Sequence, residues 1–207
     1  MAPQEKPLIT RPSAAPAGPR RMGWLLLALT VLLPSAWALK PTDHFGLKEL
    51  EAEPNLAPGN FANLFEDFAY DYYPYLQSPS TFLQNRSGDC DDYAILAAHI
   101  LGLRGFKTRL IRVELVGTRI NHVVCYVTDK KAYLDYNNRK YSINLERSGT
   151  SIRAIAEKVA DSFAKNWTTG TEYTYSYLEG RQRTVCIVVK TDPPARDPDS
   201  SPAPPAH

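Results

Sequence analysis

The sequence has little excess charge of either sign, few cysteines and no apolar run long enough to span a membrane. Its 24 lysines and arginines nearly balance 22 aspartates and glutamates, which gives a formal net charge of +2. A nucleic-acid-binding domain carries a clustered basic excess, and this composition lacks one. The composition therefore argues against nucleic acid as a partner.

The longest apolar run, residues 23–33, is shorter than the roughly 20 residues that a membrane-spanning helix needs. It follows two arginines and precedes a proline and the A-x-A pattern of residues 36–38. This order is typical of a secretory signal peptide, with Met22 available as a later translation start. We therefore expect residues 1–38 to be a leader and the protein to be exported, to a periplasmic or extracellular location. Removal of the leader leaves no stable membrane span, whereas a retained leader would anchor the chain to a membrane.

The rest of the chain shows no internal repeat and no second core. A single domain is expected from residue 40 to residue 190. The Pro-rich tail, residues 191–207, cannot bury enough apolar surface to fold and is predicted to be disordered. Helical patterns precede a series of strand-like runs, which predicts an α+β domain. The runs are residues 108–116, 122–128, 132–136, 140–143, 173–177 and 183–189, and a later helix is expected over residues 152–163.

A predicted amphipathic helix begins at Cys90. Its inner face carries an apolar series that starts with Cys90 and Tyr93, whereas Asp92, Ile95 and His99 are expected on the other side. Unpaired backbone N–H groups and the helix dipole at such a terminus stabilise a thiolate and can bind a developing oxyanion. The position of Cys90 therefore indicates a nucleophilic thiol.

A nucleophilic thiol needs a base, and the sequence has only four histidines. Three of them lie in the tail, ahead of the predicted helices, or on the helix face opposite Cys90, which leaves His122 in a predicted strand. A hairpin turn follows, for which two registers are open. Asp135 lies directly opposite His122 in one register and is its diagonal neighbour in the other, and both put the side chains on one face. This arrangement predicts Cys90 as nucleophile, His122 as base and Asp135 as the residue that orients the base.

Side chains alternate between the two faces of a strand, so Cys125 is expected on the face opposite His122, away from the site. We expect Cys125 to be chemically quiet, either buried in the far layer of the sheet or paired with Cys186 in an oxidising compartment.

Three short motifs support a family resemblance. They are G-D-C-D-D-Y-A at residues 88–94, N-H-V-V at 121–124 and Y-L-D at 133–135. In this order they resemble the transglutaminase-like superfamily, in its bacterial branch of cysteine peptidases, and residues 77–83 before the cysteine are similar to that branch as well. The resemblance implies a papain-like α+β core in which the cysteine-bearing helix packs on an antiparallel sheet. It also matches Cys90, His122 and Asp135 to the family's catalytic triad.

Gln84 and a group of acids extend this interpretation. Gln84 precedes the cysteine by six residues, as the oxyanion-hole glutamine does in papain-like enzymes, so it is a candidate oxyanion donor; a solvent-facing loop glutamine is the alternative. Asp89, Asp91 and Asp92 suit the helix dipole as first-turn acids. They are also candidate calcium ligands, because some members of the bacterial branch bind calcium through acids beside the cysteine. No other cofactor is expected.

The expected function is acyl chemistry through a Cys90 thioester, on a protein or peptide substrate. Water as acceptor gives a cysteine peptidase or amidase, and we favour hydrolysis because water is always present. An amine acceptor would give a protein-glutamine transglutaminase. A catalytically inactive, exported binding module with the same fold is a further alternative.

Mass spectrometry of the native protein tests the predicted export. The mature N-terminus should lie near Leu39, because the A-x-A pattern ends at Ala38. An intact leader on a cytoplasmic protein would contradict the prediction.

Overall fold

The computed structural model describes residues 39–40, 44–119, 121–139 and 145–191. The predicted leader, residues 192–207 of the Pro-rich tail and the strand expected over residues 140–143 lie outside these residues. Among the described helices, none is long and apolar enough to cross a membrane.

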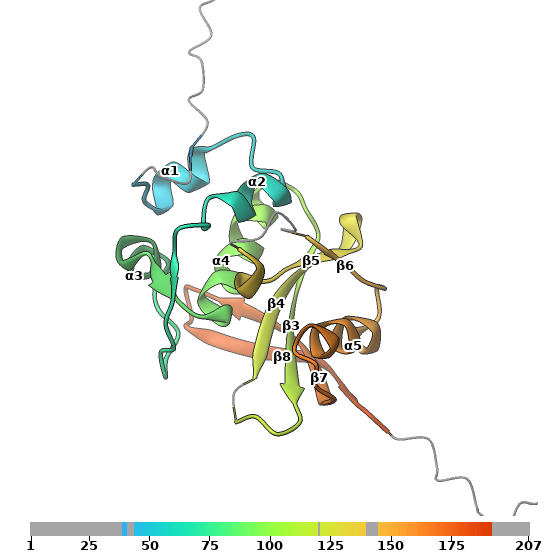
Figure 1. Ribbon diagram of the computed structural model, residues 1–207. Coiled ribbons are helices and arrows are strands. Elements are labelled where there is room, and N and C mark those ends of the chain that lie inside the picture. The colour runs from blue at the N-terminus through green and yellow to red at the C-terminus, as the bar shows by residue number, and fades with distance from the viewer. Residues whose placement is uncertain (1–38, 41–43, 120, 140–144, 192–207) are drawn as a thin grey trace, which may run out of the picture. The chain divides into compact units, whose positions relative to one another are not determined.

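A six-stranded sheet organises the domain, with the strand order β6-β5-β4-β3-β7-β8 (Figure 1). Every neighbouring pair in it is antiparallel. The strands are β3 (Thr108–Leu115), β4 (His122–Val127), β5 (Ala132–Leu134), β6 (Glu146–Arg147), β7 (Trp167–Ser176) and β8 (Arg181–Val189). Five of these overlap the strands expected from sequence, although β7 begins six residues earlier than predicted. The predicted α+β class is confirmed.

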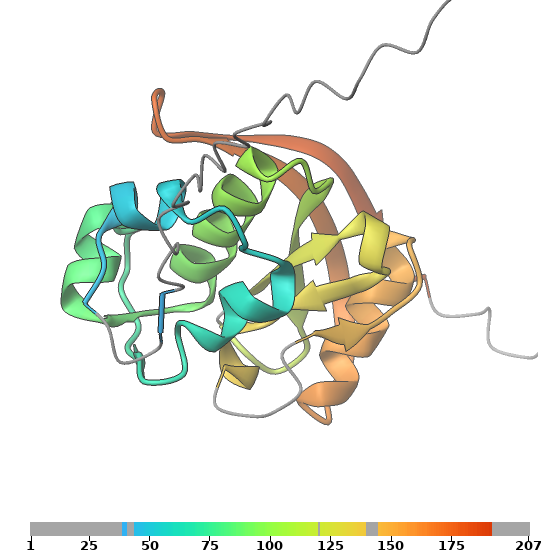
Figure 2. The same cartoon turned by 90° about the horizontal axis from the view of Figure 1, so that it is seen from above.

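Helices cover both faces of the sheet (Figures 1 and 2). The cysteine-bearing helix α4 (Cys90–Leu103) packs on one face and α5 (Ile152–Ser162) on the other. Three shorter helices come before α4: α1 (Leu47–Ala52), α2 (Pro58–Asn63) and α3 (Pro79–Asn85). A small parallel pair joins β1 (Ala69–Tyr70) to β2 (Ser87–Gly88), the segment just before α4.

The bounds of α4 are those predicted, but two of its residues are buried on the side that was expected to face away from the core. Asp92 is 3% exposed and Ile95 5% exposed, although both were expected on the face away from the core. The loop before α3 covers Asp92, and Ile95 lines a hollow against β7. A helix that other elements surround on nearly all sides shows little amphipathicity.

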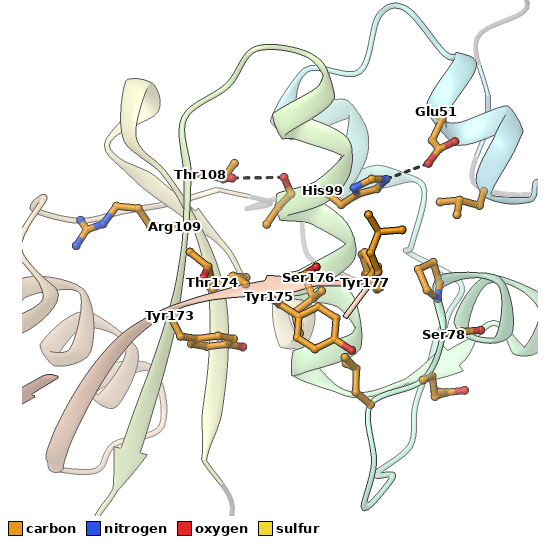
Figure 3. A pocket seen from close by; sticks show the side chains of 18 of the residues that line it. Glu51, Ser78, His99, Thr108, Arg109, Tyr173, Thr174, Tyr175, Ser176 and Tyr177 are labelled. Atoms are coloured by element: carbon orange, nitrogen blue, oxygen red, sulfur yellow. Dashed lines mark hydrogen bonds and ion pairs between the residues drawn. The ribbon is translucent and has the colours of Figure 1, made fainter. Parts of the chain in front are cut away.

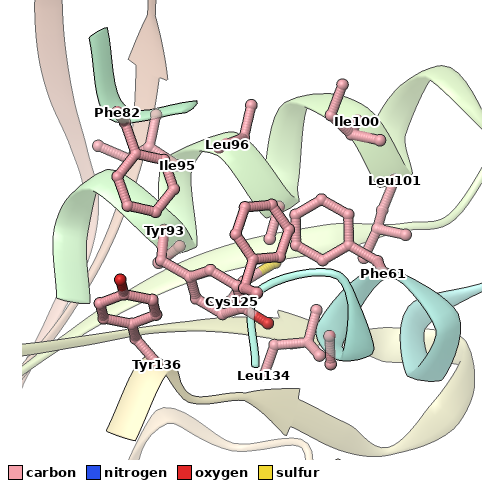
Figure 4. Close-up of a cluster of buried hydrophobic side chains, with 14 of the residues drawn as sticks. Phe61, Phe82, Tyr93, Ile95, Leu96, Ile100, Leu101, Cys125, Leu134 and Tyr136 are labelled. Atoms are coloured by element: carbon pink, nitrogen blue, oxygen red, sulfur yellow. The ribbon is translucent and has the colours of Figure 1, made fainter. Parts of the chain in front are cut away.

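Cys125 is buried as predicted, but in the layer that α4 covers (Figure 4). Burial raises the pKa of its thiol, which makes it chemically quiet. The alternative of a disulfide with Cys186 is wrong, because both thiols are free and two strands, β3 and β7, separate β4 from β8. Adjacent strands lie about 4.8 Å apart, so the Cα atoms are far beyond the roughly 7 Å limit for a disulfide.

An aromatic cluster fills the core between α4 and the preceding helices (Figure 4). Phe65 lies at its centre and is fully buried. Its ring centroid lies 4.8 Å from those of Phe61 and Phe68, and 5.2 Å from that of Tyr93. Phe65 therefore joins the segment after α2 to the cysteine-bearing helix, and Phe61 of α2 contacts Tyr93 directly, with ring centroids 5.6 Å apart.

Phe65→Ala should lower the free energy of unfolding by about 3 to 5 kcal/mol, because it leaves a cavity among rings that cannot collapse into it. Urea denaturation monitored by circular dichroism measures the loss. Tyr72→Ala, at a tyrosine that is 56% exposed, is the matched control and should change stability by less than about 0.5 kcal/mol. Equal losses in the two variants would contradict this account of the core.

Candidate active site

Cys90 is the first residue of α4, and the acids beside it form the helix cap. The side chain of Asp89 accepts the N–H of Asp91 at 3.2 Å, and that of Asp92 accepts the N–H of Asp89 at 3.2 Å. Together they form a capping box in which Asp89 also accepts the N–H of Asp92. Among the described residues, the N–H of Cys90 therefore stays without a hydrogen-bond acceptor in this turn.

His122 and Asp135 form a buried pair. Nε2 of His122 lies 2.9 Å from Oδ2 of Asp135, and both residues are at most 5% exposed. The second carboxylate oxygen of Asp135 accepts the N–H of Asn137 at 2.9 Å. The ring of Phe163 packs edge-on against the imidazole, with centroids 4.8 Å apart. Both the ring and the carboxylate therefore have fixed orientations.

The register of the β4–β5 hairpin explains why His122 and Asp135 lie close together. Cys125 pairs with Leu134, which makes Asp135 the diagonal neighbour of His122 on the same face. Of the two registers that the sequence left open, the structure has the diagonal one. Lys131, in the left-handed conformation with φ 49°, completes the turn.

The Cys90 thiol lies beside Asn121 and His122. Its Sγ donates to the carbonyl oxygen of Asn121 at 3.8 Å, and it lies near enough to the imidazole of His122 to contribute to the raised pKa of that ring. Because Nε2 of His122 faces Asp135, the other ring nitrogen, Nδ1, is the one left for the thiol. The structure thus brings together the three residues predicted as a triad.

The charge state of His122 follows from these neighbours. Burial of the ring lowers its pKa, but the charge of Asp135 and the hydrogen bonds to Asp135 and Cys90 outweigh burial and raise the pKa to about 10. An imidazolium at neutral pH can stabilise a thiolate beside it.

A family model described as a transglutaminase-like domain matches residues 51–155, half of the chain, and this segment contains all three residues. The chain belongs to the transglutaminase-like family. Comparison with curated proteins finds no match. Among solved structures, Legionella pneumophila LapG is similar at 18% identity over 51% of this chain and 73% of that chain, with a TM-score of 0.34.

A cleft of about 250 Å³ opens on Cys90 of the transglutaminase-like domain. One wall is the segment from Tyr72 to Leu76, and the other comes from β3 and the loop before β4, with Arg112, Arg119 and Asn121. Tyr72 and Tyr75 are exposed along the first wall. The cleft is therefore open to solvent.

Gln77, which the sequence did not single out, fixes the tyrosine wall to α4. Its backbone N–H and its Nε2 donate to the two oxygens of Asp92, at 2.7 and 2.9 Å. The carboxamide also binds Ser87 and Asn85, and Gln77 is only 5% exposed. A Cβ on Gly88 would lie 2.7 Å from this carboxylate, so glycine is required at that position. Asp92 thus positions both the helix start and the cleft wall.

Tyr70 is a second residue that sequence reasoning missed. The β1–β2 pair places it beside Gly88, two residues before Cys90. Its pKa is raised by partial burial and then by the negative charges of four neighbours, Cys90, Asp89, Asp135 and Asp91. Its hydroxyl therefore stays neutral and available as a hydrogen-bond donor.

The structure does not bring Gln84 to the cleft. It lies exposed on α3 and lines a separate hollow with His44, Phe45 and Leu83. The six-residue spacing from Cys90 was the only sequence signal for Gln84. On α3 its side chain lines the separate hollow instead of the cleft.

The acids beside Cys90 have side-chain oxygens within 4.8 Å of one another, a donor set that fits Ca²⁺. Burial, a shared hydrogen bond with Asp89 and the charges of Asp89 and Asp92 raise the pKa of Asp91 to about 8, against the lowering effect of Arg112. Helix capping is a sufficient reason for Asp89 and Asp92 to lie beside Cys90, without a bound ion. Calcium binding by Asp89, Asp91 and Asp92 stays a prediction.

A larger hollow of about 990 Å³ lies along α4 and β7, with Tyr173, Tyr175 and Tyr177 on its wall (Figure 3). A hydrogen bond between Nε2 of His99 and Oε1 of Glu51, at 2.9 Å, borders it. None of the three triad residues lines it. His99 therefore lies apart from the cleft at Cys90.

Histidine NMR tests the electrostatics of the pair. His122 should carry an imidazolium signal at pH 8, because its pKa is raised to about 10 and its proton leaves only as the pH rises through that value. Asp135→Asn removes the charge that raises the pKa, so the titration midpoint should fall by at least about one unit. Asp67→Asn, at an exposed aspartate, is the control and should leave it unchanged. A His122 signal that is neutral at pH 8 in the wild type would contradict this reading of the site.

Proposed function

We propose that this domain is a thiol hydrolase that cleaves peptide or amide bonds through a Cys90 thioester. The observation that carries the proposal is the buried 2.9 Å hydrogen bond between His122 and Asp135, with the Cys90 thiol beside the imidazole at a helix start. This is the arrangement that base-assisted nucleophilic catalysis requires. Membership of the transglutaminase-like family supports the same chemistry.

In the first half-reaction, the Cys90 thiolate attacks the carbonyl carbon of the substrate and forms a tetrahedral oxyanion. The N–H of Cys90, which has no acceptor among the described residues, is the donor that the helix start offers to this oxyanion. The C–N bond then breaks, and the amine leaves with the proton of the His122 imidazolium. A thioester on Cys90 and a neutral His122 remain.

In the second half-reaction, His122 takes a proton from water as the water attacks the thioester. The acid is released, and the thiolate and imidazolium return. Asp135 stays ionised and holds the ring throughout. Water is the acceptor that the solvent-open cleft supplies, which is why we favour hydrolysis over transfer to an amine.

Substrate capture from an extract of the host tests this function. New protein N-termini, quantified by mass spectrometry, should appear with the wild type and disappear with Cys90→Ala. Cys90→Ala and His122→Ala should each lower the rate by about 10⁶-fold, and Asp135→Asn by about 10⁴-fold, because it misorients the base without removing it.

Cys186→Ala, at an exposed thiol on β8, is the matched control and should keep full activity. Incorporation of a biotinylated amine in place of new N-termini would favour the transglutaminase reaction instead. Full turnover by Cys90→Ala would refute the thioester mechanism.

A further inference from the structure

Two arginines line the cleft that opens on Cys90. Arg112 comes from β3, and the exposed Arg119 comes from the loop before β4. Among the described residues neither forms an ion pair, in contrast to Arg109 on the same strand, which pairs with Glu172. Neither charge takes part in the bond-making steps proposed for Cys90. The cleft therefore holds two positive charges whose role is open.

Uncharged groups hold the guanidinium of Arg112 in place. Its Cζ lies 4.9 Å from the ring centroid of Tyr173, and its Nη2 donates to Oε1 of Gln182 at 2.6 Å. Tyr173 is only 2% exposed, so its ring is a fixed platform for the cation. A guanidinium has five N–H donors, of which Gln182 uses one. Donors therefore remain for a planar acceptor such as a carboxylate.

Arg112 also lies close to the nucleophile. It is the direct β3 partner of Val123 on β4, which lines the same cleft. Burial raises the pKa of Tyr173, and the charges of Asp91 and Cys90 raise it as well, against the lowering effect of Arg112. Tyr173 and the guanidinium above it are therefore within electrostatic reach of Cys90.

The acids of the cleft are gathered at the helix cap. Asp89 is 4% exposed and accepts the N–H groups of Asp91 and Tyr73, at 3.2 and 3.4 Å. The side-chain oxygens of Asp89, Asp91 and Asp92 lie within 4.8 Å of one another. Arg112 lowers the pKa of Asp91, but no ion pair joins these two described residues. The β3 wall is therefore the part of the cleft that favours an anion.

We propose that Arg112 and Arg119 bind a carboxylate of the substrate, so that Cys90 attacks a peptide bond within a residue or two of that carboxylate. The inference rests on the proposed hydrolase function and names its substrate class. The planar fork of arginine binds both oxygens of a carboxylate at once. The carboxylate must lie near the attacked bond, because the cleft of about 250 Å³ is smaller than the roughly 300 Å³ of the smallest ligand pockets.

Alkylation of Cys90 tests the carboxylate site without requiring turnover. Iodoacetate and iodoacetamide both form a C–S bond with the thiolate as iodide leaves, but only iodoacetate carries a carboxylate. Peptide mapping by mass spectrometry gives the ratio of the two rates at Cys90. Arg112→Gln and Arg119→Gln should each lower the ratio of iodoacetate to iodoacetamide by about threefold or more, because each removes a positive charge near the bound carboxylate.

Two controls accompany the alkylation. Arg147→Gln, at an exposed arginine on β6, should leave the ratio at Cys90 unchanged. The ratio at Cys186, an exposed thiol on β8, should be the same in every variant. Equal thermal midpoints would show that the variants fold.

A synthetic peptide library distinguishes the two sources of a carboxylate, an acidic side chain and the C-terminus of a peptide. Peptides with Asp or Glu within two residues of the cleaved bond should have a kcat/KM about tenfold or more above that of their Asn or Gln counterparts. Arg112→Gln should reduce this preference. Cleavage at a fixed distance from the C-terminus, abolished by C-terminal amidation, would assign the carboxylate to the chain end instead.

The two experiments fail in different ways. An alkylation ratio that neither Arg112→Gln nor Arg119→Gln lowers would overturn the carboxylate site, even in a protein that cleaves peptides. Equal cleavage of acidic and amide peptides, with no dependence on the C-terminus, would overturn it as well. A ratio that both variants lower, in a protein that cleaves no peptide, would support the carboxylate site and refute the proposed hydrolysis.

Discussion

The hydrogen-bond ladder between β4 and β5 decides whether this domain has a site at all. Pairing of Cys125 with Leu134 makes His122 and Asp135 diagonal neighbours on one face. A slip of one residue would move Asp135 to the other face and leave His122 buried without its carboxylate. Contacts beyond the hairpin hold the carboxylate end in place. The Tyr136 hydroxyl donates to the carbonyl of Ala69, and buried Arg139 donates to those of Phe68 and Tyr136.

The start of α4 serves two structural demands at once. Asp89 and Asp92 cap the helix, and Asp92 also binds Gln77 and so fixes the tyrosine wall of the cleft. Acids beside a nucleophilic thiol oppose a thiolate. Burial, and after it the hydrogen bond to Asp89 and the charges of Asp89 and Asp92, raises the pKa of Asp91. The imidazolium of His122 offsets it from the other side. The site therefore balances a negatively charged helix cap against one buried cation.

The two faces and two edges of the sheet have different roles. α4 and the aromatic cluster around Phe65 cover the face toward Cys90, and α5 covers the other. The β4–β5 side carries the His122–Asp135 pair, whereas β8 on the far edge has no described element beside it. β3 and β7 thus separate the His122–Asp135 pair from the exposed edge strand β8.

The sequence by itself determined the bounds of α4, the strand that bears His122 and the shared face of His122 and Asp135. These depend on the periods of 3.6 and 2 residues, which backbone geometry imposes locally. Only the tertiary structure decided between the two hairpin registers. It also buried the side chains of Asp92 and Ile95, and it placed Cys125 on the sheet face that α4 covers. It also bound Gln77 to Asp92, paired Tyr70 with Gly88 and placed Gln84 away from the cleft. These outcomes depend on which distant segments pack together, and residue spacing along one chain carries no information about that packing.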